Sequence, residues 1–360
     1  MAPYRVSLFS ELGRYCDLTV CFEQQADDSR EKDWFINKVT NFHFIALQGW
    51  ERPVSRIKFD VWRHVKKSKY DLAIAYEYST LTGMLFILLC KLRNIPYLIN
   101  CDGAFIDKKS VKDVIKRFFI RGAVACLANG EHARSYFQNF GAEPENIHNH
   151  HFTSLYERDI AASPVKASEK AELRNEIGLA GFDKIVITVG RLIKSKRIDV
   201  AITAWSAMPA NWLLVVVGTG ELDAALRNQA KELGLGNVRF TGHLNAESLK
   251  KMYRASDLFV LPTESDVWGL VVNEALAVGL PVITTDKCIA GLELIVNGYN
   301  GHILTVGDPE QLAKVLRESL SDVAGLQKMS LNAIGAIKDY TYENVAASHL
   351  AVFGQLVQMQ

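Results

Sequence analysis

The 360-residue chain is long enough for two domains of ordinary size, each with its own hydrophobic core. Hydrophobic residues make up 49% of the chain and charged residues 22%, a balance that excludes a disordered or low-complexity protein. The 41 basic and 40 acidic side chains leave a net charge of +1, so no overall positive field favours nucleic acid as a partner.

The cysteines predict a reducing compartment. The sequence has six, none of them in a C-x-x-C pair, and several lie in apolar runs that are typical of reduced core thiols. We therefore expect a cytoplasmic protein without a cysteine metal site. No charged-then-apolar leader is visible, and the longest apolar stretch, Leu81–Cys90, is too short to span a bilayer and predicts a buried helix.

The first predicted element is a helix from Pro3 to Leu12. Apolar residues recur at three-residue spacing from Val6, and Gly13 stands where a helix can end. The competing interpretation is a short strand over Arg5–Phe9.

Short apolar runs then alternate with helical patterns through both halves of the chain. Most runs are continuous, as in strands that are covered on both faces by helices. The repeated strand–helix–strand order predicts an α/β fold with parallel sheets. The predicted strands are Asp17–Phe22, Phe42–Leu47, Asp71–Tyr76, Tyr97–Asn100, Ala123–Leu127 and Ile147–His151 in the first half, and Lys184–Val189, Trp212–Val217, Val238–Thr241, Leu258–Leu261, Val282–Thr285 and His302–Val306 in the second.

A small, polar segment predicts the domain boundary. Ala161–Ser168 contains one proline among small and polar residues, which is a linker composition. We expect an N-terminal domain over residues 1–163, a second domain over 164–340, and a final helix over 341–360 that packs back on the first domain.

Two cations follow the predicted strand Lys184–Val189. Gly190 is followed directly by Arg191 and, five residues further on, by Lys196. The carboxyl ends of parallel strands border the ligand crevice of such sheets, so both side chains are predicted to project there. A planar guanidinium and a point-like ammonium suit a diphosphate. A solvated basic turn is the competing interpretation.

A glycine turn follows the next predicted strand. Gly218 and Gly220 stand ahead of a predicted helix, where glycines allow backbone N–H groups to approach an anion. The third glycine of a dinucleotide fingerprint is absent, which disfavours a Rossmann oxidoreductase. A tight structural turn remains equally compatible with this pattern.

An acidic pair brackets a third loop. Asp266 stands at the mouth of the loop, and Glu274 lies about one turn into a predicted helix, where its carboxylate can accept hydrogen bonds from paired sugar hydroxyls. Gly269 permits a sharp turn before that helix. The backbone amides of Gly269, Leu270 and Val271 are predicted to point from the helix start toward a phosphate.

Together these segments resemble the family 4 glycosyltransferases, whose GT-B fold has two facing Rossmann-like domains with parallel sheets. The resemblance covers nearly the whole chain and is specific in the C-terminal half. The matching positions are Gly190, Arg191 and Lys196 of the G-R-x4-K segment, Gly218 and Gly220 of the glycine turn, Phe240 and Gly242 of a strand end, and Asp266 and Glu274 of the Glu-x7-Glu acidic pair.

The resemblance implies a role for each matched residue. Arg191 and Lys196 would hold the donor diphosphate and stabilise its charge as it leaves, while Glu274 would hold the ribose hydroxyls. The amides of residues 269–271 would contact phosphate. The backbone after Gly242 would meet the base, at His243 and Leu244.

Two departures from the family pattern bear on the sugar. Asp266 is one methylene shorter than the usual Glu that contacts the donor sugar, which leaves the identity of that sugar open. In the N-terminal half, Asp102 ends a predicted strand where many relatives place a His facing the transferred sugar. This resembles a subgroup acting on bacterial surface polysaccharides, although a turn or helix-cap aspartate remains an alternative.

The start of the chain also departs from the family pattern. Relatives begin with an apolar strand and a glycine-rich turn. With a helix over Pro3–Leu12, the N-terminal sheet is expected to be one strand short, and the acceptor side to lack its glycine-rich wall.

A basic segment of the N-terminal half predicts contact with an anionic membrane. Its cations interleave with apolar residues in the manner of an amphipathic helix that lies on lipid headgroups. A solvated helix that covers the domain core is the alternative. The cations are Lys108, Lys109, Lys112, Lys116, Arg117 and Arg121.

The sequence therefore predicts a retaining glycosyltransferase that uses a nucleotide-diphosphate sugar, with a UDP-sugar favoured, and a glycan or lipid-linked saccharide acceptor in cell-surface polysaccharide synthesis. No D-x-D segment is present, and the cluster of His148, His150 and His151 is split between strand faces, so no metal or other cofactor is expected. The alternatives are a GT-B sugar phosphorylase, a nucleotide-sugar epimerase and a non-catalytic nucleotide-sugar binding module.

Overall fold

The chain divides into two compact units in the computed structural model, which describes residues 2–23, 39–52, 55–102 and 112–358. Unit 1 comprises Met1–Ser154 and Tyr340–Gln360, and unit 2 comprises Leu155–Asp339. The passage between them therefore precedes the segment Ala161–Ser168 that we expected to be the linker. The Ala161 amide donates a 2.8 Å hydrogen bond to the Ala277 carbonyl, which ties that segment to unit 2.

Unit 2 contains a six-stranded sheet in which every pair of neighbouring strands is parallel. The strand order is β11-β10-β9-β12-β13-β14. The four inner strands are buried over almost their whole length, as their continuous apolar sequences predict. The strands are β9 (Lys184–Val189), β10 (Trp212–Val217), β11 (Val238–Gly242), β12 (Leu258–Leu261), β13 (Val282–Thr285) and β14 (Gly301–Leu304).

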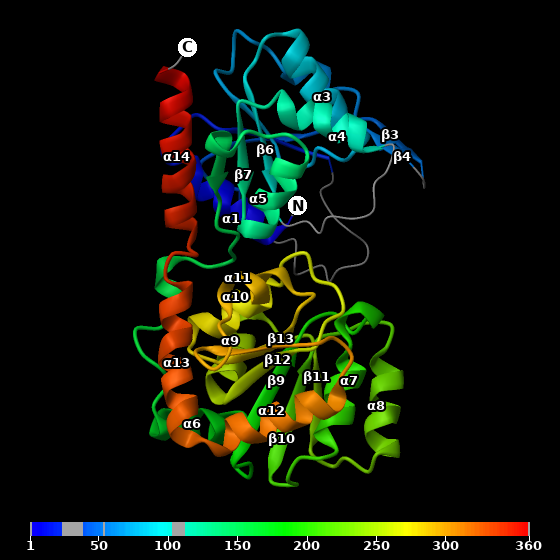
Figure 1. Ribbon diagram of the computed structural model, residues 1–360, viewed down its shortest axis with the longest axis vertical. Helices are drawn as coiled ribbons and strands as arrows, with labels where there is room; N and C mark the ends of the chain where they lie inside the picture. Colours follow the sequence, from blue (N-terminus) through cyan, green and yellow to red (C-terminus); the bar gives the residue numbers. More distant parts are fainter. Residues whose placement is uncertain (1, 24–38, 53–54, 103–111, 359–360) are drawn as a thin grey trace. The chain divides into compact units, whose positions relative to one another are not determined.

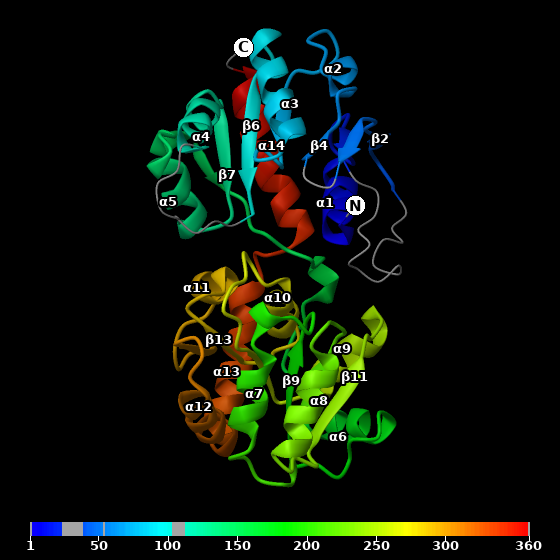
Figure 2. The same ribbon diagram turned by 90° about the vertical axis from the view of Figure 1, so that its right-hand side faces the viewer.

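Helices cover both faces of this sheet, as Figures 1 and 2 show. One core is built around the fully buried Trp205, whose indole N–H donates to the Asn237 carbonyl at 3.1 Å. Asp308 caps one helix through a 2.9 Å hydrogen bond from the Gln311 amide. The helices are α6 (Ala167–Glu176), α7 (Ile198–Trp205), α8 (Asp223–Glu232), α9 (Ala246–Ala255), α10 (Leu270–Ala277), α11 (Ile289–Leu294), α12 (Pro309–Ser321) and α13 (Val323–Ile337), with 3-10 turns η3 (Glu157–Asp159) and η4 (Lys194–Lys196).

Unit 1 carries its parallel strands in two separate sheets. One has the order β1-β2 and the other the order β5-β6-β7-β8. A short antiparallel pair, β3 (Trp50–Arg52) with β4 (Ser55–Ile57), adds a hairpin that the sequence did not predict. The other strands are β1 (Thr19–Phe22), β2 (His43–Ala46), β5 (Ala73–Ala75), β6 (Tyr97–Cys101), β7 (Ala125–Ala128) and β8 (Ile147–Asn149).

The first helix of unit 1, α1 (Pro3–Leu12), has the bounds predicted from the sequence, so the alternative of a strand over Arg5–Phe9 is wrong. Its apolar side chains, Phe9 among them, are buried on several sides of the helix. Helix α1 packs against the last helix, α14 (Tyr342–Gln358), as Figure 2 shows. The remaining helices of the unit are α2 (Val61–His64), α3 (Leu81–Leu92), α4 (Lys112–Arg121) and α5 (Glu131–Asn139), with a 3-10 turn η2 (Pro144–Asn146).

The strands predicted from apolar runs are confirmed, and four of them, β9, β10, β12 and β13, have the predicted bounds. No helix among the described residues is long and apolar enough to cross a membrane. The predicted stretch Leu81–Cys90 forms most of α3, and its Ile87 and Cys90 are buried.

Candidate functional site

The sheet of unit 2 has a topological switch point between β9 and β12. From β9 the chain proceeds through β10 to β11 on one side of the sheet, then returns to β12 on the other side of β9. The loops that leave two adjacent parallel strands in opposite directions form a crevice at their carboxyl ends, where ligands bind in open α/β sheets. The loops after β9 and β12 carry Arg191, Lys196 and Asp266, so these predicted residues belong to one sheet edge.

Lys196 and Asp266 form an ion pair across this switch point. The Lys196 ammonium hydrogen-bonds the Asp266 carboxylate, and each side chain is only 16% exposed. By contrast, Arg191 is exposed, and its guanidinium has no hydrogen-bond or ion-pair partner among the residues described. The site therefore combines one compensated cation with one that is free to bind an anion.

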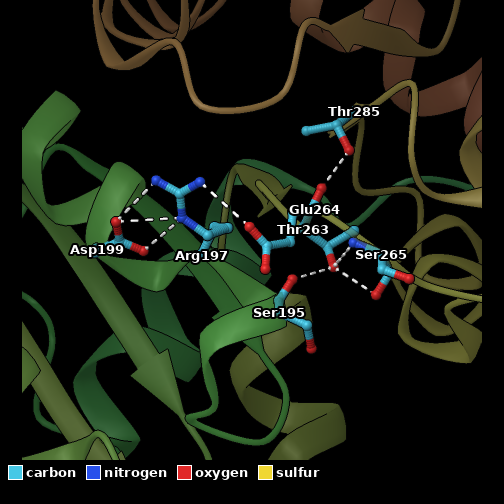
Figure 3. Close-up of polar contacts among 7 residues, drawn as sticks. All are labelled: Ser195, Arg197, Asp199, Thr263, Glu264, Ser265 and Thr285. Carbon is cyan, nitrogen blue, oxygen red and sulfur yellow. Dashed lines mark hydrogen bonds and ion pairs between the residues drawn. The ribbon is translucent and has the colours of Figure 1, made fainter.

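Hydroxyl and backbone hydrogen bonds hold together the loops after β9 and β12 and the end of β13, as Figure 3 shows. The Thr263 hydroxyl donates to the Ser195 carbonyl at 2.8 Å, and the Glu264 amide donates to the same carbonyl at 2.8 Å. The Thr285 hydroxyl donates to the Thr263 carbonyl at 2.5 Å. These bonds fix the loop that ends in Lys196 against the loop that leads to Asp266.

Arg197 provides a second clamp on the same loops. Its backbone lies in the left-handed region at φ 49°, which non-glycine residues seldom adopt outside functional sites and tight turns. Its guanidinium donates to the Asp199 carboxylate at 3.1 Å and to the Glu264 carboxylate at 3.5 Å. Figure 3 shows the guanidinium lying between the two carboxylates. We infer that Arg197 compensates its backbone strain by joining η4 to the start of α7 and to the β12 loop.

The glycine turn after β10 is required by close packing. Gly218 has φ 135°, and a Cβ at this residue would lie 1.9 Å from the Gly190 carbonyl oxygen. A Cβ at Gly220 would lie 2.4 Å from the Leu192 carbonyl oxygen. The Gly218 amide donates to the Gly242 carbonyl at 2.9 Å, so it is committed to the neighbouring strand end. The glycines thus let the loops after β9 and β10 touch.

The predicted helix start at the acidic loop is present. Gly269, at φ 97°, is the residue before α10, whose first residues are Leu270 and Val271. The first N–H groups of any helix lack partners within the helix and attract anions. Glu274 lies on the same helix, and its carboxylate accepts a 3.2 Å hydrogen bond from the Tyr253 hydroxyl.

Two residues beside the Asp266–Glu274 loop, Tyr253 and Cys288, have raised pKa values. Burial, and then the Glu274 carboxylate, raise the pKa of Tyr253 well above its ordinary value, so this phenol stays protonated and donates. Burial raises the pKa of Cys288 to about 12, and the thiol donates to the Trp268 carbonyl at 3.2 Å. The buried Cys288 therefore contributes to the packing of this loop.

The strand end predicted to meet a base lies two strands from β9. Strand β11 ends at Gly242, which has φ 71°, and is followed by the exposed His243 and the half-buried Leu244. Asn245 then caps α9 by accepting a 2.9 Å hydrogen bond from the Ser248 amide. The two predicted base-contacting residues thus occupy a short loop at the carboxyl edge of the sheet.

Asp102 lies in unit 1, at the carboxyl end of β6. Its carboxylate forms an ion pair with Arg5 of α1 and accepts a 2.7 Å hydrogen bond from the side-chain amide of Asn100. Arg5 is 8% exposed, and its guanidinium lies 4.4 Å from the centroid of the Tyr76 ring. Residues 103–111, which include Gly103, lie outside the described part of the chain.

The predicted histidine group at the end of β8 includes one buried ring. His150 is buried, with both ring nitrogens unpaired among the described residues, and stacks edge-on against His349 at 4.8 Å between ring centroids. Within the described parts of the chain, no three His, Cys, Asp or Glu side chains gather closely enough to hold a metal ion.

Three residues that support the site were not singled out from the sequence, namely Arg197, Tyr253 and Arg5. Arg197 directly follows Lys196, so its position in a basic run was the sequence feature that could have indicated its role. Arg5 and Tyr253 contact Asp102 and Glu274 only through the tertiary fold.

Comparison with known proteins gives a family similarity for unit 2. Residues 169–335, all in unit 2, match the family model described as Glycosyl transferases group 1. The chain is 30% identical over 196 residues to an uncharacterized glycosyltransferase of Methanocaldococcus jannaschii, covering 53% of this chain and 50% of that protein. It is 24% identical over 314 residues to D-inositol 3-phosphate glycosyltransferase 1 of Catenulispora acidiphila, covering 80% and 73%. It spans about half the length of several curated relatives that it matches.

Solved structures share the fold over nearly the whole chain. HepE of Anabaena in complex with UDP superposes with a TM-score of 0.77 at 19% identity, covering 98% of this chain and 96% of that one. Sucrose-phosphate synthase from Thermosynechococcus elongatus gives a TM-score of 0.77 at 19% identity, covering 99% and 93%. The predicted fold class is thereby confirmed. Residues 169–335 form a Glycosyl transferases group 1 domain within a chain that has the GT-B fold.

Proposed function

We propose that this chain is a retaining glycosyltransferase. It transfers a sugar from a nucleotide-diphosphate sugar, with a UDP-sugar favoured, to a glycan or lipid-linked saccharide in cell-surface polysaccharide synthesis. The observation that carries the proposal is the convergence of Arg191, Lys196 and Asp266 at the β9–β12 switch point, beside the start of α10. Fixed cations there would stabilise the negative diphosphate as it leaves, without a protein nucleophile.

The donor side of the proposal assigns a role to each group. Arg191 and Lys196 bind the diphosphate, and the amides at the start of α10 contact it. Glu274, oriented by Tyr253, accepts hydrogen bonds from the ribose hydroxyls. His243 and Leu244 meet the base, and Asp266 contacts the sugar. UDP is favoured because HepE, which shares the fold, was crystallised with UDP and with UDP-glucose.

The acceptor side rests on unit 1, where we propose that Asp102 faces the transferred sugar. Its ion pair with Arg5 limits the rotation of the carboxylate. The six cysteines are free thiols, and Cys90, Cys101, Cys126 and Cys288 are buried, which supports a reducing, cytoplasmic location. The phosphorylase, epimerase and binding-module alternatives are not favoured, because the matching family and curated relatives are named as glycosyltransferases.

The test combines donor binding with product analysis. A nucleotide sugar that binds only the folded protein raises its melting temperature, so a thermal-shift panel should single out UDP or a UDP-sugar. With that donor and a set of saccharide acceptors, NMR should show a product that retains the anomeric configuration of the donor. No stabilisation by any nucleotide sugar, or an inverted product, would contradict the proposal.

Metal independence is a separate part of this proposal. We expect transfer to continue in the presence of a chelator, since the two cations supply the charge that a metal would otherwise provide. The measurement is the initial rate with and without EDTA. A strict requirement for Mg²⁺ or Mn²⁺ would contradict it.

A further inference from the structure

Helices α3 and α4 are neighbours in unit 1 (Figure 1), and both expose large apolar side chains. Both bury one face in the same core, with Ile87 and Cys90 from α3 and Phe119 and Ile120 from α4. Their outer faces carry Leu92, which is 80% exposed, Val114, which is 71% exposed, and Phe118, which is 55% exposed. Large exposed apolar patches mark contact surfaces. We call this outer face, including Leu88 and Ile115, the α3–α4 surface.

Cations surround these apolar side chains, and none of the described ones is neutralised. Helix α3 carries one basic residue, and α4 carries four basic residues and one acidic residue. Lys91, Lys116, Arg117 and Arg121 have no carboxylate partner among the described residues. In unit 2, by contrast, Lys170 and Arg174 both pair with Asp257. The α3–α4 surface therefore combines apolar contact area with uncompensated positive charge.

A pocket of about 490 Å³ opens between the two helices. Three cations line it, namely Lys91, Arg117 and Arg121, together with Val114, Phe118 and Gly122. The Lys91 ammonium lies 4.6 Å from the centroid of the Phe118 ring, so an aromatic face holds it in place without removing its charge. The lining suits a ligand with a phosphate group and an adjoining hydrocarbon part.

We propose that the α3–α4 surface rests on an anionic lipid bilayer, with a phospholipid phosphate in the pocket formed by Lys91, Arg117 and Arg121. Exposed Leu, Val and Phe side chains enter the interfacial region, while the cations remain at the level of the headgroups. This contact is peripheral. It depends on the proposed function in one respect, which is that it would bring a lipid-linked acceptor within reach of the protein. Vesicle binding itself needs no transfer reaction.

Charge complementarity favours this partner over two others. A second copy of the chain, docked through the same surface about a twofold axis, would place Arg117 and Arg121 against like charges. A nucleic acid would satisfy the cations, but its backbone offers nothing to cover Leu92 and Val114. An anionic bilayer satisfies both the charges and the apolar side chains.

The test is co-sedimentation of the full chain with vesicles of phosphatidylcholine, with and without 30% phosphatidylglycerol. We expect binding only to the anionic vesicles, and weaker binding as salt is raised. The variant K91Q/R117Q/R121Q should bind about 100-fold more weakly, because each cation near an anionic surface contributes a factor of about five. The variant L92S/V114S has the same charge as the wild type but should bind about tenfold more weakly, because it loses apolar contact area.

A matched control removes the same charge elsewhere. Lys231, Lys328 and Lys338 are exposed in unit 2 and have no ion-pair partner among the described residues, so K231Q/K328Q/K338Q should keep vesicle binding within about threefold of the wild type. UDP binding, measured on the same preparations, reports that unit 2 is intact. If the wild-type chain does not bind UDP, that result counts against the proposed function and not against the membrane contact.

Several results would overturn the membrane contact. These are equal binding to neutral and anionic vesicles, equal losses in the control and in K91Q/R117Q/R121Q, or no vesicle binding at all. Stabilisation of the protein by inorganic phosphate, together with no vesicle binding, would show a site for a soluble phosphate instead. Dimerisation that the L92S/V114S variant abolishes would show that a second copy covers the surface.

Discussion

The Lys196–Asp266 ion pair couples two residues to which the family resemblance assigns separate roles. Each side chain is largely shielded from solvent, so removing one partner leaves the other charge partly buried and uncompensated. An anionic diphosphate would compete with Asp266 for the Lys196 ammonium. We therefore expect the two positions to behave as a coupled pair rather than as independent contacts.

Replacing either cation should slow the transfer reaction. Arg191→Ala and Lys196→Ala should each lower kcat by about 10² to 10³, on the order of 3–4 kcal/mol, because each removes charge stabilisation from the leaving diphosphate. The matched control is Lys194→Ala, an exposed lysine of the same turn that has no ion-pair partner in the described part of the chain. Wild-type rates in both test variants would remove these residues from the mechanism.

Glu274 and Asp266 should be distinguishable by calorimetry with UDP and with the full donor. Glu274→Gln should weaken binding of both ligands by about tenfold, since the ribose is common to them. Asp266→Asn should leave UDP bound at least as tightly, because it frees the Lys196 ammonium, and should weaken the full donor. Equal losses of UDP binding in both variants would contradict this division of roles.

At the scale of the elements, continuous apolar runs were sufficient to predict the strands, and β9, β10, β12 and β13 have the predicted bounds. The fold of unit 2 was therefore predictable, because buried parallel strands carry a strong local signal. The β3–β4 hairpin was not, because Trp50–Arg52 and Ser55–Ile57 are three-residue strands that mix polar and apolar residues. Local patterns do not determine such short pairings.

The candidate site was predictable only in part. Glycines and charged residues at strand ends indicate an anion site, but not which side chains pair. Lys196 and Asp266 are 70 residues apart, and Arg5 and Asp102 are 97 residues apart. The first pair depends on β9 and β12 being neighbours in the sheet, and the second depends on the packing of α1. Residue spacing along the sequence predicts neither pair.

The turn after β10 gives a test of this packing. Gly218→Ala should lower the melting temperature and weaken UDP binding, because the new Cβ would lie 1.9 Å from the Gly190 carbonyl oxygen and φ is 135°. A destabilisation of about 1–3 kcal/mol is expected for such a strained position. Gly236→Ala is the control, since a Cβ there meets nothing within 4 Å. An unchanged melting temperature in Gly218→Ala would show that the two loops can separate freely.

At the scale of the whole molecule, the stability of unit 1 should depend on pH through buried histidines. Burial lowers the pKa of His349 to about 4, and burial with neighbouring His349 and Arg5 lowers the pKa of His150 well below its ordinary value. The His349 Nδ1 donates to the Val345 carbonyl at 2.8 Å, and its Nε2 accepts from the Tyr76 hydroxyl at 3.2 Å. Both hydrogen bonds fit the neutral ring.

The sign of the pH dependence follows from these lowered pKa values. Between about pH 6.5 and pH 4 the unfolded chain binds protons that the folded unit does not, so the free energy of unfolding falls as the pH falls. His349 alone should account for a loss on the order of 3 kcal/mol. Hydrogen exchange of the α14 amides measures this loss within unit 1.

A substitution at His349 can distinguish the effect of this buried ring on stability from the general effect of acid. His349→Phe keeps a ring against His150 and Phe353 and removes the titrating group, so it should show a shallower decline over the same pH range. His43→Gln, at an exposed position on β2, should keep the wild-type decline. An identical pH dependence in His349→Phe and the wild type would contradict this origin.

The pairing of α1 with α14 has a consequence for the order of synthesis. Unit 2 is one continuous segment, Leu155–Asp339, whereas unit 1 needs both Met1–Ser154 and Tyr340–Gln360. As the chain leaves the ribosome, unit 2 can complete its core while the buried face of α1 still lacks its partner helix. The part of α1 that packs against α14 therefore stays uncovered until residues 340–360 are made. Translation speed and chaperone access over this interval will govern how much of the newly made protein becomes native.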